Sequence, residues 1–223
     1  NRGIFPQLYN GQNSDFFFME CHENQDVLNT IIKLVSQRLP NRYGFNPTED
    51  IQVLAPMKKG IIGTENLNQA LQQILNPKEM ALFRAGYKFQ VGDKVMQIRN
   101  DYKKEVFNGD IGYIQDIDSE EQQVLVRFEE RDVPYDYADL DELVLAYAIS
   151  IHKFQGSECP CVVMPVHTSH FMLLHRNLLY TGITRGKKLV VLVGTKKALA
   201  IAVKKDDVQK RHTSLQQTLM ELL

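Results

Sequence analysis

Short apolar runs alternate with segments of helical periodicity along this chain, and this alternation constrains the fold more than any other feature. The runs lie at residues 16–20, 51–55, 143–150, 162–165 and 189–194. Strands that are largely apolar along their length are buried on both faces, which is typical of a parallel sheet covered by helices. The sequence therefore predicts an α/β domain built on a parallel sheet.

Apolar side chains recur at helical spacing between these runs. Asn24 and Thr64 are residue types that cap helix N-termini, and each precedes such a segment. Helices are also expected around residues 175–185 and over residues 196–204. Three more leucines at helical spacing end the chain: Leu215, Leu219 and Leu222.

The periodicity changes at about Gly86. Short strand-like runs at residues 94–99, 111–117 and 124–128 follow, separated by turn signals such as Asn108-Gly109-Asp110. We predict a small antiparallel β-barrel over residues 86–142, inserted into an α/β domain made of residues 1–85 and 143–223.

The charge balance excludes a strongly basic nucleic-acid-binding protein. The chain has 26 Lys and Arg against 27 Asp and Glu, with a formal net charge of -1. Any DNA contact must therefore come from local side chains, because no bulk positive field exists. No apolar stretch approaches the ~20 residues that span a bilayer. We expect a cytoplasmic location without a membrane partner, and the absence of an initiator Met indicates a truncated sequence.

A Cys-Pro-Cys motif raises the question of a metal site. Cys159 and Cys161 are separated by one residue, whereas zinc sites use wider cysteine spacings. His167 and His170 follow, but the intervening run is typical of a buried strand. We therefore predict no metal ligands in this chain and interpret the cysteines as core residues.

The string Asn177-Leu-Leu-Tyr-Thr-Gly-Ile-Thr-Arg185 directly precedes the last apolar run. An arginine between a helix and a buried strand can neutralise charge on a transferring phosphoryl group. It can also be an ordinary surface arginine stabilised by the helix dipole. Tyr180 in the same string could stack near a nucleotide base or simply pack in the helix.

A second polar string, Ser150-Ile-His-Lys-Phe-Gln-Gly-Ser-Glu158, precedes the run at 162–165. Gly156 allows backbone amides to approach a phosphate or ribose, and Gln155 can both donate and accept hydrogen bonds. Glu158 is a suitable acceptor for a ribose hydroxyl. A surface loop with a capping serine is the plainer interpretation.

The chain lacks the motif that would hold nucleotide phosphates. No Gly-x-x-x-x-Gly-Lys-Ser/Thr string occurs, and the Asp141-Glu142 pair precedes an apolar strand instead of following one. An arginine finger without a phosphate loop is half of an ATPase site. We therefore expect this chain alone to be inactive.

With these strings in place, the chain resembles the C-terminal part of a RecD-like superfamily 1 DNA helicase, the class related to the exodeoxyribonuclease V alpha subunit. The two polar strings resemble motifs V and VI, and Val53-Leu-Ala-Pro-Met-Lys-Lys-Gly60 resembles the motif IV region. Val91-Gly-Asp-Lys-Val-Met-Gln97 resembles the start of the inserted barrel in this family. Phe154, Gly182 and Gly186 depart from the residues frequent in these motifs.

The resemblance implies a RecA-like second motor domain in a 5′-to-3′ motor that uses ATP and Mg²⁺. Both would be bound mainly by the N-terminal motor domain, which is a partner together with single-stranded DNA. Arg185 would be catalytic, and the expected nucleotide-binding residues are Gln155, Gly156, Glu158 and Tyr180. The expected DNA contacts are Lys58, Lys59, Asn100, Asn108, Ser150 and His152. The alternative is a non-catalytic nucleic-acid or protein-binding module that keeps a helicase-like core.

Overall fold

A computed structural model describes residues 3–6, 8, 11, 14–129 and 131–206. The predicted helical segment with Leu215, Leu219 and Leu222 lies outside the described residues. Within the described part, no helix is both long enough and apolar enough to cross a membrane.

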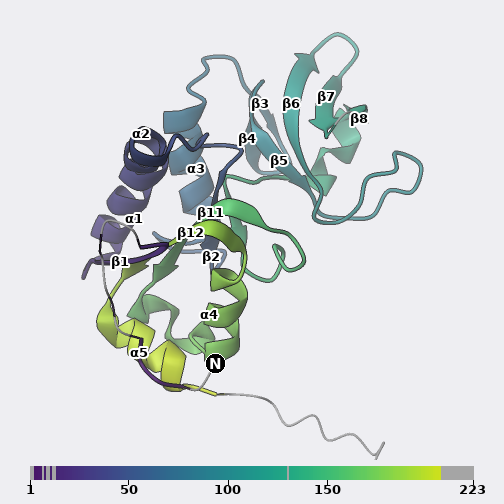
Figure 1. The fold of residues 1–223 in the computed structure, drawn as a ribbon. Coiled ribbons are helices and arrows are strands. Elements are labelled where there is room, and N and C mark those ends of the chain that lie inside the picture. The colour runs from purple at the N-terminus through teal and green to yellow at the C-terminus, as the bar shows by residue number, and fades with distance from the viewer. Residues whose placement is uncertain (1–2, 7, 9–10, 12–13, 130, 207–223) are drawn as a thin grey trace, which may run out of the picture.

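The larger part of the molecule is built on a five-stranded parallel sheet (Figure 1). Its order is β1 (Phe16–Glu20), β12 (Gly186–Gly194), β11 (Cys159–Val166), β2 (Ile51–Ala55) and β10 (Ala148–Ser150). Every neighbouring pair of these strands is parallel. The predicted α/β fold is therefore confirmed.

Helices cover both faces of this sheet. The first face carries α1 (Asn24–Lys33), which continues through a π-helical turn (Leu34–Arg38) into α2 (Leu39–Tyr43), and α3 (Thr64–Leu75). The second carries α4 (Arg176–Ile183) and α5 (Lys196–Lys204), with a 3-10 helix at Thr168–Leu173.

The two predicted N-caps are each displaced by one residue. Glu23 and Gly63 occupy the cap positions, whereas Asn24 and Thr64 are the first helical residues. Asn24 Oδ1 instead accepts a hydrogen bond from Ser169 Oγ at 3.1 Å. The Thr64 backbone N–H donates to the Met57 carbonyl at 2.9 Å, which ties the helix start to the preceding turn.

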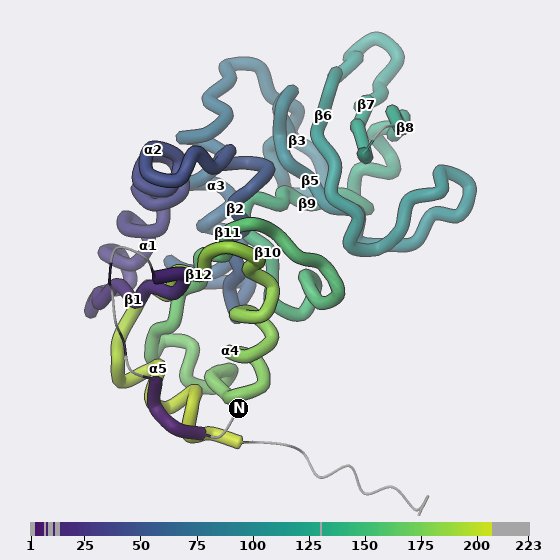
Figure 2. The backbone as a smooth tube through the Cα atoms, in the orientation of Figure 1, coloured from purple at the N-terminus to yellow at the C-terminus, as the bar shows by residue number. Residues whose placement is uncertain are grey.

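A second sheet has five antiparallel strands in the order β8 (Arg131–Asp136), β7 (Gln123–Phe128), β6 (Ile111–Asp118), β5 (Lys94–Gln97) and β9 (Leu143–Leu145). The hairpin of β3 (Leu82–Arg84) and β4 (Tyr87–Phe89) precedes it, and a 3-10 helix (Tyr137–Glu142) precedes β9. This is the small antiparallel unit expected after Gly86, although β8 carries a Pro and mostly exposed side chains and was not predicted. The path of the chain is drawn in Figure 2.

The predicted strand over residues 143–150 is wrong in one respect. Leu143–Leu145 pairs with β5 of the antiparallel sheet, whereas Ala148–Ser150 pairs with β2 of the parallel sheet. Ala146 and Tyr147 connect the two and are buried. The run is apolar throughout because it passes through both sheets, so hydropathy could not show where one strand ends. The division into residues 1–85 with 143–223 and 86–142 remains a prediction.

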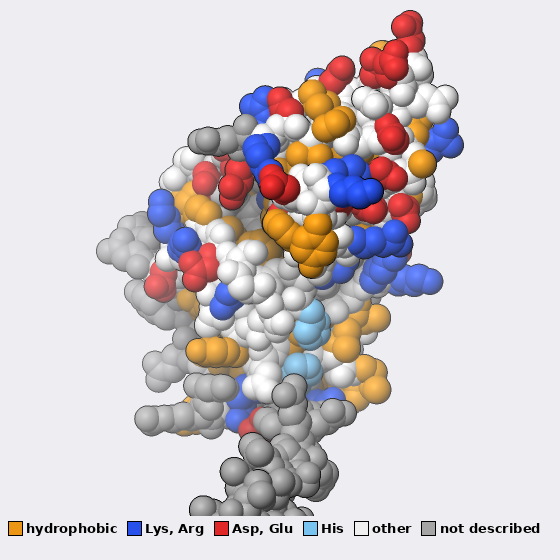
Figure 3. All heavy atoms as spheres, turned by 90° about the vertical axis from the view of Figure 1, so that its right-hand side faces the viewer, with side chains coloured by type: hydrophobic (Ala, Val, Ile, Leu, Met, Phe, Trp, Pro, Cys, Tyr) orange, Lys and Arg blue, Asp and Glu red, His pale blue; other side chains and the backbone are white. Residues whose placement is uncertain are grey.

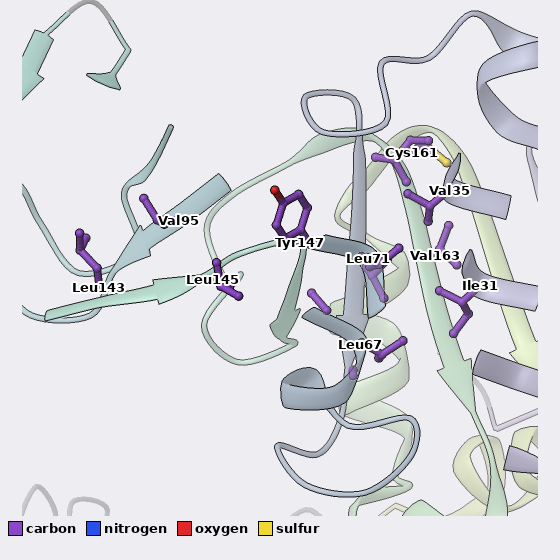
Figure 4. Close-up of a cluster of buried hydrophobic side chains, with 14 of the residues drawn as sticks. Ile31, Val35, Leu67, Leu71, Val95, Leu143, Leu145, Tyr147, Cys161 and Val163 are labelled. Carbon is purple, nitrogen blue, oxygen red and sulfur yellow. The ribbon is translucent and has the colours of Figure 1, made fainter. Parts of the chain in front are cut away.

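One hydrophobic cluster extends across both sheets. Figure 4 shows Ile31 and Val35 beside Cys161 and Val163, with Tyr147 and Leu145 leading toward the antiparallel sheet. A second cluster under α4 and α5 fills the other face of the parallel sheet and includes Met96 of β5, with Ile98, Ile111 and Val144 packed against it. The antiparallel sheet therefore contributes apolar side chains to both clusters.

Buried polar groups also join the two sheets. The Asp93 carboxylate, just before β5, accepts hydrogen bonds from Gln72 Nε2 at 2.5 Å, Asn76 Nδ2 at 2.8 Å and the Tyr147 hydroxyl at 3.0 Å. Burial raises the pKa of Asp93, and these donors oppose that shift. The next residue, Lys94, donates from Nζ to Gln52 Oε1 of β2 at 2.9 Å.

Candidate nucleotide and nucleic-acid site

Arg185 directly follows the last turn of α4, at the amino edge of the parallel sheet. Its guanidinium donates to three oxygens: Nε to the Thr181 carbonyl at 3.3 Å, Nη1 to the Ser157 carbonyl at 3.2 Å and Nη2 to Thr184 Oγ1 at 3.2 Å. The side chain is half-buried, and no carboxylate pairs with it among the described residues. A guanidinium has five N–H donors, so three bonds leave one free on each Nη.

Arg185 also joins the two polar strings. The Cys159 backbone N–H donates to the Arg185 carbonyl at 3.0 Å, while the guanidinium holds the Ser157 carbonyl. The loop between β10 and β11 is therefore fastened to the end of α4 at two points. The parallel pairing of β11 with β12, with Cys159 level with Gly186, brings the strings together.

The loop itself is shaped by local hydrogen bonds. The Lys153 and Phe154 N–H groups donate to the Ser150 carbonyl at 3.0 and 3.3 Å, and the Ser157 N–H donates to the Phe154 carbonyl at 3.2 Å. Phe154 is buried and anchors the loop on the core. Gly156 has φ +90°, with open space where a Cβ would lie, so its backbone is approachable.

The other predicted nucleotide contacts lie close in sequence to Arg185 or to the loop between β10 and β11. Gln155 and Glu158 are exposed, and Glu158 pairs with Lys187 at 3.1 Å. The Tyr180 ring is 54% exposed, so it does not pack in the core. A Cβ on Gly182 would lie 2.7 Å from Met164 Sδ, so an alanine there would require the Met164 side chain to shift.

Two predicted DNA contacts line a cleft of about 220 Å³ between α3, β10 and the antiparallel sheet. They are Lys58, from the turn before α3, and Ser150, from the end of β10. Lys153 lines the same cleft, and burial followed by the charge of Lys58 lowers its pKa. Lys58 Nζ also lies 3.4 Å from Glu65 Oε1.

The remaining predicted contacts are exposed. Lys59 and His152 lie on turns at the carboxyl ends of β2 and β10. Asn100 and Asn108 lie together on the hairpin between β5 and β6, where the Asn108 N–H donates to Asn100 Oδ1 at 2.9 Å. The roles of all these residues remain predictions.

Two structural partners of the site were not predicted. Asn68 on α3 forms a pair of hydrogen bonds with the Ala148 backbone, at 2.8 and 2.7 Å, and so ties the motif IV helix to edge strand β10. Ser157 acts through its carbonyl, which carries no side-chain signal. Lys153 was visible within the second polar string, but its place in the cleft depends on the tertiary fold.

The cysteines behave as core residues. Cys161 lies in the cluster under α1 and Cys159 in the cluster under α4, because the pairing of β11 with β12 is irregular between them. Burial raises the pKa of Cys159 to about 11 and that of Cys161 to about 12. His167 bonds to the His22 carbonyl at 2.8 Å, and burial lowers the pKa of His170 to about 4.

Comparisons with known proteins agree with this architecture. Residues 67–128 match the ATP-dependent RecD-like DNA helicase SH3 domain, and residues 145–193 match the UvrD-like helicase C-terminal domain. An ATP-dependent RecD2 DNA helicase of Deinococcus radiodurans is 37% identical over 74% of this chain and 23% of that protein. The RecBCD enzyme subunit RecD of Haemophilus influenzae is 26% identical over 97% of this chain and 36% of that protein.

Solved structures show the same fold. A Pif1 helicase from Bacteroides in complex with ADP-AlF3 and single-stranded DNA gives a TM-score of 0.53 at 16% identity, over 92% of this chain and 54% of that chain. Pif1 helicase from Candida albicans gives 0.51 at 13% identity, over 90% of this chain and 58% of that chain. At these identities the likeness concerns the fold alone.

The parallel sheet with its two polar strings and the two domain matches define the C-terminal region of a UvrD-like helicase. Within that class, the chain belongs to the RecD-like family. The predicted family is therefore confirmed. The chain spans 23% and 36% of the lengths of the two curated relatives.

Proposed function

We propose that this chain forms the second motor domain, with its SH3-type unit, of an ATP-dependent DNA helicase that translocates on single-stranded DNA and unwinds duplex. Its relatives are named as an ATP-dependent RecD2 DNA helicase and a RecBCD enzyme subunit RecD, and the Bacteroides neighbour was solved with single-stranded DNA. The family resemblance implies 5′-to-3′ movement.

The observation that carries the proposal is the state of Arg185. The guanidinium is held in place by three neutral oxygens, has no carboxylate partner among the described residues and keeps one free N–H on each Nη. Those two donors match two oxygens of one phosphoryl group, as arginine commonly does in bidentate contacts. A fixed cation of this kind lowers the barrier without having to reorganise.

The remaining residues have supporting roles in this proposal. Gly156 and Gln155 approach the nucleotide from the loop that Arg185 fastens, with Glu158 and Tyr180 beside them. ATP phosphates and Mg²⁺ would be held by the N-terminal motor domain, which faces the Arg185 side. Closure of the two motor domains would then bring the guanidinium to the γ-phosphoryl group.

The test is DNA-stimulated phosphate release by the full-length protein with Arg185→Ala. We expect turnover to fall about 10³-fold, the usual contribution of an arginine finger, with nucleotide affinity nearly unchanged. Arg127→Ala is the matched control, since Arg127 is an exposed arginine paired with Asp132 in the antiparallel sheet. Near-normal turnover in Arg185→Ala would leave only a structural role, as the binding-module alternative requires.

A further inference from the structure

The hairpin between β5 and β6 presents two exposed aromatic side chains that no part of the proposed site uses. Tyr102 is 76% exposed and Phe107 is 44% exposed. Their rings contact each other edge to face, with 5.9 Å between centroids. Scattered exposed aromatics are common, but a mutually packed pair on one projecting hairpin needs an explanation.

The hairpin is built as a rigid support for this pair. Asp101 and Val106 form a β-bridge with hydrogen bonds of 2.8 and 3.0 Å, and Asp101 Oδ1 accepts the Lys103 and Lys104 N–H groups at 2.8 and 3.0 Å. Val106 is fully buried.

Two ion pairs tie the hairpin to neighbouring elements. Lys104 Nζ donates to Asp139 Oδ2 at 2.8 Å and lies over the Tyr135 ring. On the surface, Arg131 donates to the Glu105 carboxylate at 2.6 Å and to the Glu105 carbonyl at 2.7 Å. These contacts fix the hairpin, while Tyr102, Lys103 and Phe107 are exposed.

The hairpin lies against the loop that follows β10. A Cβ placed on Gly109, two residues after Phe107, would lie 4.0 Å from the Lys153 carbonyl oxygen, so the base of the hairpin lies next to the His152-Lys153 turn. Lys103 is exposed and has no acidic partner among the described residues. Figure 1 shows the hairpin projecting beside β5 and β6, and Figure 3 shows hydrophobic, basic and acidic side chains interspersed on that side of the molecule, with histidines below them.

We propose that Tyr102 and Phe107 form a base-stacking platform for single-stranded DNA beside the motif V loop. This proposal rests on the helicase function proposed above. Bases stack on aromatic rings regardless of sequence, and a neighbouring cation such as Lys103 neutralises the phosphates. Two rings flanked by polar residues form too small an apolar area for a stable protein interface, so the observations favour DNA.

The experiment compares a base-containing oligonucleotide with one that carries abasic sites, both bound to the full-length protein at several salt concentrations. We expect Tyr102→Ala and Phe107→Ala each to weaken binding to the normal strand about tenfold, because stacking contributes ~1–3 kcal/mol per base. The salt slope should not change, and the abasic strand should bind wild type and variants alike. Tyr102→Phe should bind like wild type.

Two controls separate stacking from charge and from general damage. Lys103→Ala should reduce the salt slope by about 0.7 without distinguishing the two strands. Tyr43→Ala removes another exposed aromatic with a basic neighbour, Arg42, on α2, and should change neither affinity nor slope.

A second measurement tests the platform even if the alanine variants fail to fold. This chain contains no Trp, so Tyr102→Trp introduces a unique reporter within it. Its fluorescence should be quenched by the base-containing strand and not by the abasic strand.

Unchanged affinity in both alanine variants, or equal losses on both strands, would overturn the platform. Loss of self-association with unchanged DNA affinity would also overturn it in favour of a protein interface. Failure of the wild-type protein to bind any single strand would remove the proposed function together with the platform, and is a separate outcome.

Discussion

The molecule holds its candidate functional cations in two different ways. Arg185 lies at the amino edge of the parallel sheet, half-buried, with three of its five N–H donors fixed by neutral oxygens. Lys58, Lys59 and Lys103 lie on exposed turns. A guanidinium held in one orientation can stabilise a transition state, whereas exposed lysines add diffuse attraction for phosphates. We therefore expect substitution of Arg185 to reduce activity strongly and substitution of each exposed lysine to reduce DNA affinity only slightly.

Replacing Arg185 by Lys should have the largest effect on ATP turnover. A lysine keeps the charge but loses the planar fork and cannot hold Ser157, Thr181 and Thr184 together. We expect DNA-stimulated ATP turnover of the full-length protein to fall about 10³-fold, close to the effect of alanine. Turnover within tenfold of wild type would show that charge alone suffices and that the fixed geometry is unimportant.

The buried hydrogen bonds of Asp93, which join the two sheets, should have the next largest effect. Asp93→Ala leaves the Gln72, Asn76 and Tyr147 donors without their acceptor, and each buried unpaired group costs ~1–3 kcal/mol. We expect urea unfolding of the chain to show a loss of about 3 kcal/mol. Asp118→Ala, at an exposed turn, should lose less than about 1 kcal/mol. Equal losses in the two variants would contradict a structural role for these hydrogen bonds.

Lys94 gives the contact between the two sheets a pH dependence. Burial lowers the pKa of Lys94 to about 8. Between that value and the unfolded pKa near 10.5, the unfolded chain binds more protons at this residue, so Lys94 contributes a rise of stability with pH. Below about pH 8 the cost of burying the charge is constant, and above about pH 9 the raised pKa values of Cys159 and Cys161 act in the opposite direction. Lys94→Met should therefore make the slope of the urea midpoint against pH, measured from pH 7 to 10.5, less positive than in the wild type; identical pH profiles for the two proteins would contradict the contribution of Lys94.

The exposed lysines should give the smallest effect. Lys58→Ala together with Lys59→Ala removes two cations, one of which already pairs with Glu65. We expect single-strand affinity of the full-length protein to fall only a few-fold and the salt slope to fall by at most ~1.4, at ~0.7 per phosphate. His152→Ala should weaken binding without changing the slope. A loss of single-strand affinity of more than a hundredfold in the Lys58→Ala/Lys59→Ala variant would contradict the distinction between the exposed lysines and Arg185.

Much of the parallel sheet could be predicted from the sequence. Runs such as Leu189–Gly194 are apolar on every residue because both faces are covered, and that signal is strong. The motif strings predict Arg185 and the loop after Ser150 from their residue types and spacing. The structure places the two in contact, and their functional roles remain predictions. Strand β8 was missed because Pro134 and its charged neighbours face solvent.

Tertiary contacts account for the rest. The run at 143–150 is divided between two sheets, which hydropathy cannot show, and Arg185 is held by backbone carbonyls of Thr181 and Ser157. The sequence predicts an insertion over residues 86–142 but does not show the contacts that tie it to the rest of the chain, such as Asp93 bonded to Gln72 of α3 and the cluster shared by both sheets. Such contacts depend on where the chain returns in space.

We propose that this chain supplies one half of an ATPase site. The most direct test is DNA-stimulated phosphate release measured side by side for the 223-residue chain and for the full-length protein. We expect turnover by the full-length protein and none by the chain alone. Turnover by the chain that survives repurification, or a full-length protein that binds single-stranded DNA without hydrolysing ATP, would contradict it.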